Sequence, residues 1–112
     1  MKRDKIGNII RAGTRFGNVL YGYVRIFDKD FNLQSDFYTT DITSIWSFNI
    51  SPENEIWIAT NKGLLRSKDG NKSYQTVSFL NINTTAITFT DNGEVWVSTQ
   101  EGIFKSANQG KN

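Results

Sequence analysis

Two arginines near the start of the chain have the residue type and spacing that suit anion binding. Arg11 and Arg15 lie within the first 25 residues, which hold six basic side chains and one acidic one, Asp4. The other 87 residues hold seven basic and ten acidic groups, so the two parts carry +5 and −3. Guanidinium groups match carboxylates and phosphates, and concentrated charge attracts anions. We therefore predict that Arg11 and Arg15 bind an anionic ligand; ordinary exposed arginines are the alternative.

A group of oxygen-bearing side chains follows further along the chain. Asp28, Asp30, Asn32 and Asp36 occupy positions 1, 3, 5 and 9 of one segment, a spacing that suits a hard cation. The segment resembles the calcium loops of integrin-type propellers, but Leu33 stands where such loops need glycine. Asp and Asn are also common turn formers. We predict no metal site, and calcium binding by these four residues stays an open alternative.

The composition excludes several kinds of chemistry. The chain has 112 residues with no cysteine and no histidine, which excludes a thiol nucleophile, a cysteine-based zinc site and a histidine base. We predict no cofactor. No apolar run approaches the roughly 20 residues of a membrane helix, and no signal-peptide core is present. No membrane partner is therefore predicted, and the compartment is assigned to the cytoplasm only by default.

The second half of the chain contains an internal repeat. Glu55-Ile56-Trp57-Ile58-Ala59-Thr60 is matched by Glu94-Val95-Trp96-Val97-Ser98-Thr99, a period of 39 because 96 − 57 = 39. The same offset matches Gly63-Leu64-Leu65-Arg66-Ser67 to Gly102-Ile103-Phe104-Lys105-Ser106. A repeat of this length is typical of stacked structural units.

Each repeat unit is predicted to consist of short strands joined by tight turns. The segments around Trp57 and Trp96 are β-branched, aromatic and too short for helices. Upstream, residues 43–48 match residues 84–89, and Gly63 and Gly102 suit turns that need a positive φ. No stretch shows the 3.6-residue period of an amphipathic helix. The fold class predicted is all-β, with four antiparallel strands per unit.

Two motifs then resemble known families. Trp57-Ile58-Ala59-Thr60-Asn61-Lys62-Gly63-Leu64 resembles the W-I-G-T-x-x-G-L core of two-component-regulator-type propeller blades. The segment from Ser67 to Tyr74 resembles the Asp-box, S-x-D-x-G-x-T-W, of bacterial neuraminidase repeats and related photosystem-assembly propellers. It departs from the box at three positions, where Asn71, Ser73 and Tyr74 replace Gly, Thr and Trp. The resemblance implies β-propeller blades, with the box as a turn between a blade's third and fourth strands, and implies little about function.

The resemblance implies about three blades in a single segment over residues 1–112. They are a divergent blade over about 5–39, a blade over about 40–80 and an incomplete blade over about 81–112, whose box falls at 106–112. The divergent blade is expected to make a long excursion near residues 13–17; alternatively, residues 6–12 form a spare strand that pairs with another blade or chain. Because propellers close with four to eight blades, we predict a homodimer that completes one ring. An excised piece of a longer protein is the alternative.

Three tryptophans are candidate binding residues. Trp57 and Trp96 occupy the same repeat position, and packing between blades is predicted for both, in preference to an aromatic platform for ligand stacking. Trp46 differs, since its partner in the next unit is Ile87. We predict that Trp46 lies on an innermost strand and contacts a ligand near the channel, with core packing as the alternative.

The Asp-box resemblance also raises sialidase chemistry. That reaction needs an arginine cluster, a tyrosine nucleophile with a glutamate, and a separate acid. Arg11, Arg15 and Arg25, with Tyr21 or Tyr23, supply some of these residue types in one blade, without the motif context. We predict no catalytic residue and place Tyr21 and Tyr23 with Arg11 and Arg15 in the ligand site.

The function predicted is a non-catalytic binding or scaffolding module. Its expected ligand is a glycan, an anionic small molecule or a protein, bound near the channel by turns at residues 14–18, 51–54 and 91–93. Nucleic acid is not the expected partner. One alternative is the ligand-sensing segment of a larger two-component-type receptor, and another is a sialidase-like hydrolase.

Overall fold

The computed structural model describes residues 2–17, 19–79 and 81–106, and in this part of the chain all regular structure is β-strand. Eleven strands form three antiparallel sheets, which confirms the all-β prediction. The N-terminal sheet consists of β1 (Lys2–Arg3), β2 (Ile9–Phe16), β3 (Leu20–Phe27) and β4 (Leu33–Thr39). The central sheet consists of β5 (Ile45–Ile50), β6 (Ile56–Thr60), β7 (Gly63–Ser67) and β8 (Gln75–Ser78). The C-terminal sheet consists of β9 (Thr84–Phe89), β10 (Val95–Thr99) and β11 (Gly102–Ser106).

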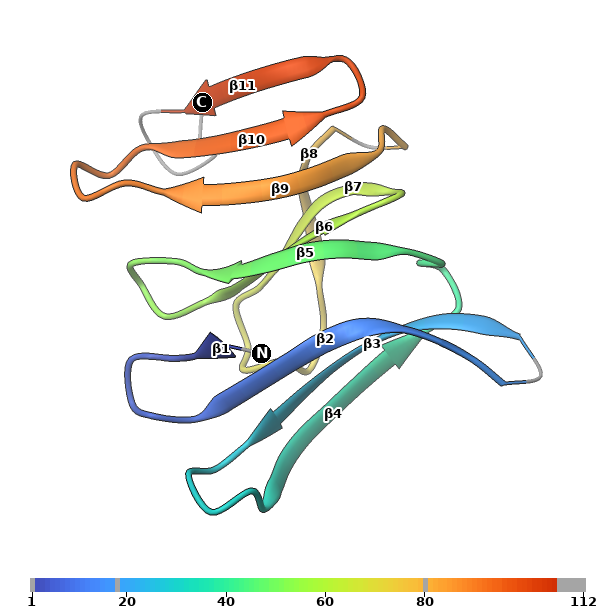
Figure 1. The fold of residues 1–112 in the computed structure, drawn as a ribbon, viewed down its shortest axis with the longest axis vertical. Helices are drawn as coiled ribbons and strands as arrows, with labels where there is room; N and C mark the ends of the chain where they lie inside the picture. The colour runs from blue at the N-terminus through green and yellow to red at the C-terminus, as the bar shows by residue number, and fades with distance from the viewer. Residues whose placement is uncertain (1, 18, 80, 107–112) are drawn as a thin grey trace.

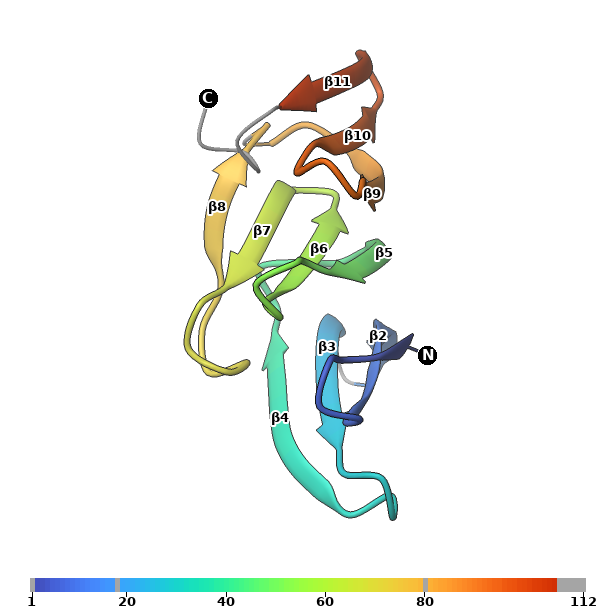
Figure 2. The ribbon, with the colours of Figure 1, turned by 90° about the vertical axis from the view of Figure 1, so that its left-hand side faces the viewer.

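The three sheets stack in chain order. Figure 1 shows β5 lying between β2 and β9, and both neighbours contact β5. Figure 2, turned by 90°, shows the later strands of the N-terminal and central sheets extending away from this row, from β2 to β4 and from β5 to β8. The central sheet is therefore covered on both faces, which explains why every residue of β6 is buried.

Two apolar cores fill the spaces between the sheets. Ile10 and Val24 of the N-terminal sheet pack with Phe48, Ile56 and Ile58 of the central sheet. On the other side, the alternate residues of the central sheet pack against the C-terminal sheet in a cluster formed by Trp57, Ala59, Leu64, Ile87, Val95 and Val97. Full burial of one such large side chain contributes about 1.5–3 kcal/mol. The period-2 alternation of β6 thus serves two cores at once.

The repeat is visible as a shared register. Trp57 pairs with Arg66 across β6 and β7, and Trp96 pairs with Lys105 across β10 and β11. Gly63 and Gly102, which begin β7 and β11, have φ values of 112° and 130°, as the turn prediction requires. A Cβ atom at Gly63 would lie 2.4 Å from the Phe79 carbonyl oxygen, so no larger residue fits there.

The register of the first strands differs from the sequence prediction. Ile50 pairs with Ile56 and Phe89 pairs with Val95, so β5 and β9 are related by 39 residues rather than 41. Trp46 therefore corresponds to Thr85 and not to Ile87. Both positions are skipped in the pairing, because each strand carries an irregularity of one extra residue at that point. Because the irregularity lies at the same repeat position in both strands, it leaves the period of 39 unchanged. The predicted offset of 41 came from matching residues of similar type in 43–48 and 84–89.

The N-terminal sheet also corrects two expectations. The excursion near residues 13–17 is absent from the described residues, since β2 continues in regular pairing with β3 from Ile9 to Phe16. Residues 6–12 do not form a spare strand for another chain, since residues 9–12 begin β2 of this sheet and residues 6–8 precede it. Both four-stranded sheets have their strands in chain order, β1-β2-β3-β4 and β5-β6-β7-β8, and β1 has only two residues. Residue 18 and the expected box over residues 107–112 lie outside the described residues.

Candidate anion-binding face

Four of the five residues predicted to bind a ligand lie on one sheet face. Arg15 pairs with Tyr21, and Gly13 pairs with Tyr23, across β2 and β3. Directly paired residues point to the same side of a sheet, and Arg11 lies on that side because it is two residues from Gly13. This side is opposite to the one that carries Ile10 and Val24 into the core. We call it the arginine–tyrosine face, and it consists of Arg11, Arg15, Tyr21, Tyr23, Arg25, Asp36 and Tyr38.

Tyr23 is the centre of this face. Its ring lies across Gly13, where an added Cβ would come within 3.3 Å of the tyrosine hydroxyl. The guanidinium carbons of Arg15 and Arg25 lie 5.2 Å and 5.1 Å from the ring centroid, within cation–π range. These contacts leave Tyr23 only 8% exposed. The two guanidinium groups are thereby held in place by an aromatic ring on a rigid sheet.

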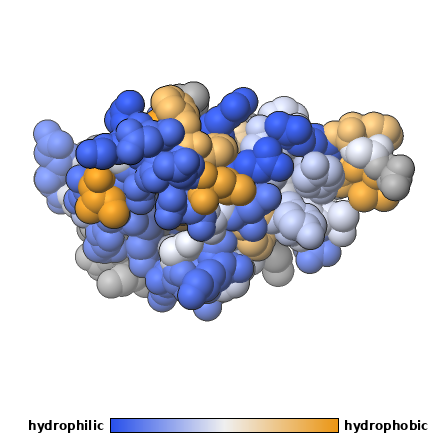
Figure 3. Space-filling model, turned by 90° about the horizontal axis from the view of Figure 1, so that it is seen from below, coloured by the Kyte–Doolittle hydropathy of each residue, from blue (hydrophilic) through white to orange (hydrophobic). Residues whose placement is uncertain are grey.

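The charges on the face are unevenly paired. Arg25 Nε donates to Asp36 Oδ1 at 3.2 Å, so one cation is balanced by the one carboxylate of the face. Among the described residues, neither Arg11 nor Arg15 forms an ion pair, and both are exposed. Three guanidinium groups and one carboxylate leave the face at +2. Figure 3 looks onto this side of the molecule and shows a mostly hydrophilic surface.

Two more tyrosines extend the face. Tyr21 and Tyr38 meet edge to face with ring centroids 6.2 Å apart, and Tyr38 is 69% exposed. Beyond them, the tip of the β2–β3 hairpin exposes Phe16, Val19 and Leu20, and Figure 3 shows an apolar patch at this end. Tyr38 was not predicted from the sequence, and Asp36 was named only as a possible calcium ligand. The alternation of Asp36, Phe37 and Tyr38 in β4 is the signal that could have indicated them.

Trp46 does not belong to this face. It lies on β5 of the central sheet, is 56% exposed, and donates its indole N–H to Asn83 Oδ1 at 3.1 Å. This hydrogen bond links the central sheet to the segment that precedes β9. The predicted site is therefore divided between two surfaces, one with Trp46 and one with the remaining four residues.

The residues proposed as calcium ligands have other partners. Asp28 Oδ1 accepts hydrogen bonds from the backbone N–H groups of Asp30 and Asn32, both at 2.9 Å, which closes a turn. The Asn32 backbone hydrogen bond is the main cause that lowers the pKa of Asp28. Asp36 pairs with Arg25 on the sheet face. In the described part of the chain, no three acidic side chains converge on one point.

The turn between β7 and β8, from Ser67 to Tyr74, is built around Asp69. Its Oδ1 accepts from Ser67 Oγ at 2.8 Å and from the backbone N–H of Ser73 at 3.0 Å, and its Oδ2 accepts from Ser73 Oγ at 2.5 Å. The hydrogen bond from the Ser73 hydroxyl is the largest cause that lowers the pKa of Asp69, well below its usual range. The turn lies between the third and fourth strands of the central sheet, as expected for it.

The pH dependence of the melting temperature tests the contribution of Asp69 to stability. Because the folded state lowers the pKa of Asp69, its contribution to stability is complete above the unfolded-state pKa of about 4 and is lost as the pH falls further. We expect Asp69→Asn to lower the melting temperature at pH 7 and to flatten its decline below about pH 4. Thermal unfolding of both proteins over this pH range measures the difference. Parallel curves for the two proteins would show that Asp69 is not the titrating group.

Comparison with known proteins adds no relative, since no family model, curated protein or solved structure matches the chain. The described residues contain no helix of the length and apolarity that crossing a membrane requires. Function must therefore be argued from the arginine–tyrosine face itself.

Proposed function

We propose that this chain is a non-catalytic binding module whose arginine–tyrosine face recognises an anionic glycan. The observation that carries the proposal is the pair Arg11 and Arg15, exposed and without an acidic partner in the described structure, on a sheet face lined by tyrosine rings. Guanidinium groups bind carboxylates in a forked geometry, and aromatic rings contact the apolar faces of sugars. The two residue types together favour an acidic sugar over a simple anion.

The spacing of the two arginines favours a ligand of several sugar units. Arg11 and Arg15 are four residues apart on one strand, so their Cα atoms are separated by about 13 Å at 3.3–3.4 Å per residue. The ring of Tyr23 lies over Gly13, midway between them. Two cationic positions spaced along one strand match an oligosaccharide with repeated carboxylates, of which each guanidinium group can bind one.

The polar character of this face supports ligand binding. The opposite face of the same sheet is apolar and packs on the central sheet. The side of the central sheet that looks toward the N-terminal sheet is also apolar, with Phe48, Ile56 and Ile58 buried there. The N-terminal sheet carries Arg and Tyr on its own outward side instead. A polar outward side of this kind suits solvent or a polar ligand and does not suit packing against another apolar sheet face.

Catalysis is not part of the proposal. A retaining sialidase pairs its tyrosine nucleophile with a glutamate. The four glutamates of the chain are at positions 53, 55, 94 and 101, in or beside the central and C-terminal sheets. The carboxylate that the face does hold, Asp36, is paired with Arg25.

Binding of an oligogalacturonate tests the proposal. We expect calorimetry to show saturable binding of the oligogalacturonate and no binding of a neutral glucose oligomer of equal length. The variant Arg11→Ala/Arg15→Ala should lose at least about tenfold in affinity, because each charge-assisted hydrogen bond contributes about 1.5–3 kcal/mol. Lys62→Ala/Lys72→Ala removes the same charge from exposed positions elsewhere and is the matched control. An equal loss of affinity in the control would show that net charge alone accounts for the effect. Unchanged affinity in the arginine variant would refute the site.

We further propose that the three sheets are consecutive blades of the propeller type. Support comes from the 39-residue register shared by the central and C-terminal sheets, from the row formed by β2, β5 and β9, and from the place of the turn that contains Asp69. The blade limits proposed from the sequence are about 5–39, 40–80 and 81–112. The two internal limits agree with the ends of the sheets, whereas β1 of the N-terminal sheet lies before residue 5.

A scaffold closed by a second copy is the second candidate function. The observation that favours it is the outer face of the C-terminal sheet, where Trp96 is 42% and Ile103 is 70% exposed. The residues 39 positions earlier, Trp57 and Leu64, are buried by the next sheet. In a ring of two copies, this face would meet the arginine–tyrosine face of the partner. Ring closure and glycan binding therefore compete for one surface.

Light scattering on a sizing column tests the ring. We expect a mass of two chains at high protein concentration and a shift to one chain when saturating oligogalacturonate is added, because both need the arginine–tyrosine face. A single-chain mass at every concentration would exclude the ring and leave the glycan proposal standing.

A further inference from the structure

An apolar cleft opens between the central and C-terminal sheets. Its volume is about 250 Å³, and it lies between β7 and β8 on one side and β10 and β11 on the other. Its apolar lining consists of Leu64, Val77, Phe79, Val95, Val97 and Phe104. The rings of Phe79 and Phe104 meet at 4.9 Å between centroids, yet Phe104 remains 42% exposed. An apolar space of about 150 Å³ already holds one benzene ring, so the cleft has room for an aromatic side chain.

The equivalent position in the preceding pair of sheets is filled by Tyr74. The Tyr74 ring contacts Phe37 of the N-terminal sheet, with the ring centroids 4.6 Å apart and the planes tilted by 52°, and it packs on the core that contains Ile56 and Ile58. Val95 and Val97, which line the cleft, lie 39 residues after Ile56 and Ile58. Phe104 likewise lies 39 residues after Leu65. A ligand in the cleft would therefore contact apolar side chains at the same repeat positions as those on which Tyr74 packs.

In the part of the chain that the structure describes, the strand edge next to the cleft is also unpaired. In the central sheet, β8 pairs with β7 at Leu64, Leu65 and Arg66. The corresponding positions of β11 are Ile103, Phe104 and Lys105, and no described strand pairs with that edge. An unpaired edge offers a row of backbone donors and acceptors to an incoming strand.

We infer that the cleft and the outer edge of β11 together bind an extended peptide that carries an aromatic side chain. The guest strand would pair with β11 as β8 pairs with β7, and its aromatic ring would enter the cleft as Tyr74 enters the equivalent space. The partner's chemistry is that of the segment Ser73-Tyr74-Gln75-Thr76-Val77: an aromatic residue followed by polar and β-branched residues in an extended conformation. This surface is separate from the arginine–tyrosine face, so the inference does not rest on the proposed function.

A fluorescent peptide with the sequence of residues 72–79 tests the inference on the full chain. We expect a saturable rise in anisotropy with the unmodified peptide, and at least tenfold weaker binding when its tyrosine is replaced by alanine. Equal binding of the two peptides, or no saturable binding of the first, would overturn the inference.

Two protein variants locate the binding site. Phe104→Glu places a charge in the cleft at a side chain that is already partly exposed, and we expect it to abolish peptide binding. Thr88→Glu places the same charge on β9, on the opposite face of the same sheet and away from the β11 edge, at an exposed side chain, and we expect unchanged binding. Circular dichroism verifies that both variants fold. Binding retained by Phe104→Glu, or lost equally in both folded variants, would show that the peptide does not use the cleft.

Discussion

Replacing Trp57 with alanine is expected to lower the free energy of unfolding by about 4 kcal/mol, near the upper end for aromatic core truncations. The side chain is fully buried, its ring meets Phe89 of the next sheet edge to face at 5.1 Å, and the guanidinium carbon of Arg66 lies 5.5 Å from its centroid. The truncation would leave a cavity between two sheets whose backbones are fixed by pairing. Such a loss is a large part of the 5–15 kcal/mol that stabilises a typical domain.

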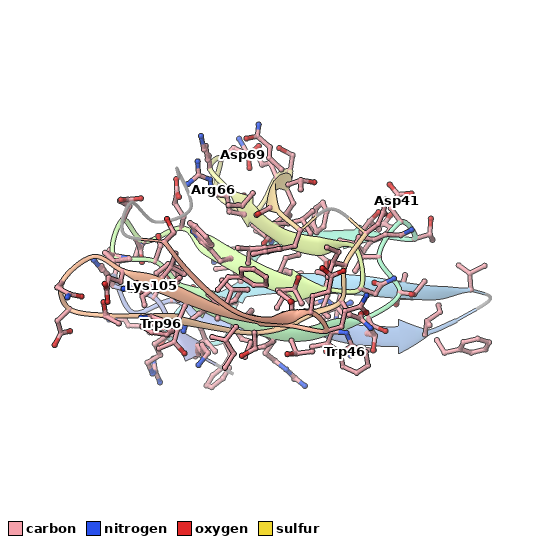
Figure 4. All side chains as sticks on the ribbon, turned by 90° about the horizontal axis from the view of Figure 1, so that it is seen from above. Asp41, Trp46, Arg66, Asp69, Trp96 and Lys105 are labelled. Carbon is pink, nitrogen blue, oxygen red and sulfur yellow. The ribbon has the colours of Figure 1, made fainter. Side chains whose placement is uncertain are left out.

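Trp96→Ala is the matched control for this prediction. Trp96 has the same repeat position as Trp57. It also has a cation near its ring, since Lys105 Nζ lies 5.5 Å from the ring centroid. Figure 4 shows Trp96 and Lys105 side by side on the C-terminal sheet. Because Trp96 is 42% exposed, we expect a loss of about 1 kcal/mol or less. Urea unfolding followed by circular dichroism measures both variants, and equal losses in dilute protein would contradict the packing described here.

The strands themselves could be predicted because their signals are local. The residue types around Trp57 and Trp96, the turn glycines Gly63 and Gly102, and the lack of a helical period all act within a few neighbouring residues. The stacking order of the central and C-terminal sheets could be expected from the repeat, since each unit needs a neighbour to bury its apolar face. These features required no knowledge of distant contacts.

The environment of each tryptophan could not be predicted, because it depends on distant contacts. Trp57 and Trp96 have nearly identical sequence surroundings, and only the presence of another sheet buries one and exposes the other. Trp46 was aligned with Ile87 because residues 43–48 and 84–89 have similar residue types, whereas the strand pairing relates Trp46 to Thr85. The arginine–tyrosine face depends on the pairing of β2 with β3, which the expected excursion near residues 13–17 would have prevented.

Asn71→Ala is expected to lower the free energy of unfolding by about 3 kcal/mol. Asn71 is 1% exposed, and its Nδ2 donates to the Val24 carbonyl oxygen at 2.9 Å and to Ser35 Oγ at 3.1 Å, both in the N-terminal sheet. Its Oδ1 accepts from the Tyr74 hydroxyl at 2.6 Å. Removal of the amide leaves buried polar groups without partners, at about 1–3 kcal/mol each. Equilibrium denaturation measures the loss.

Asn71→Gly distinguishes the contribution of the side-chain amide to stability from that of the backbone conformation. Asn71 has a φ of 79°, a conformation that glycine adopts freely, that asparagine tolerates and that alanine adopts only at a cost of about 1 kcal/mol. We therefore expect Asn71→Gly to lose about 2 kcal/mol, less than Asn71→Ala but still most of the effect. If Asn71→Gly leaves the free energy of unfolding unchanged, the hydrogen bonds between the sheets contribute nothing to stability. The asparagine that departs from the Asp-box pattern thus keeps the backbone conformation that the pattern's glycine would allow, and its side chain adds a polar link between two sheets.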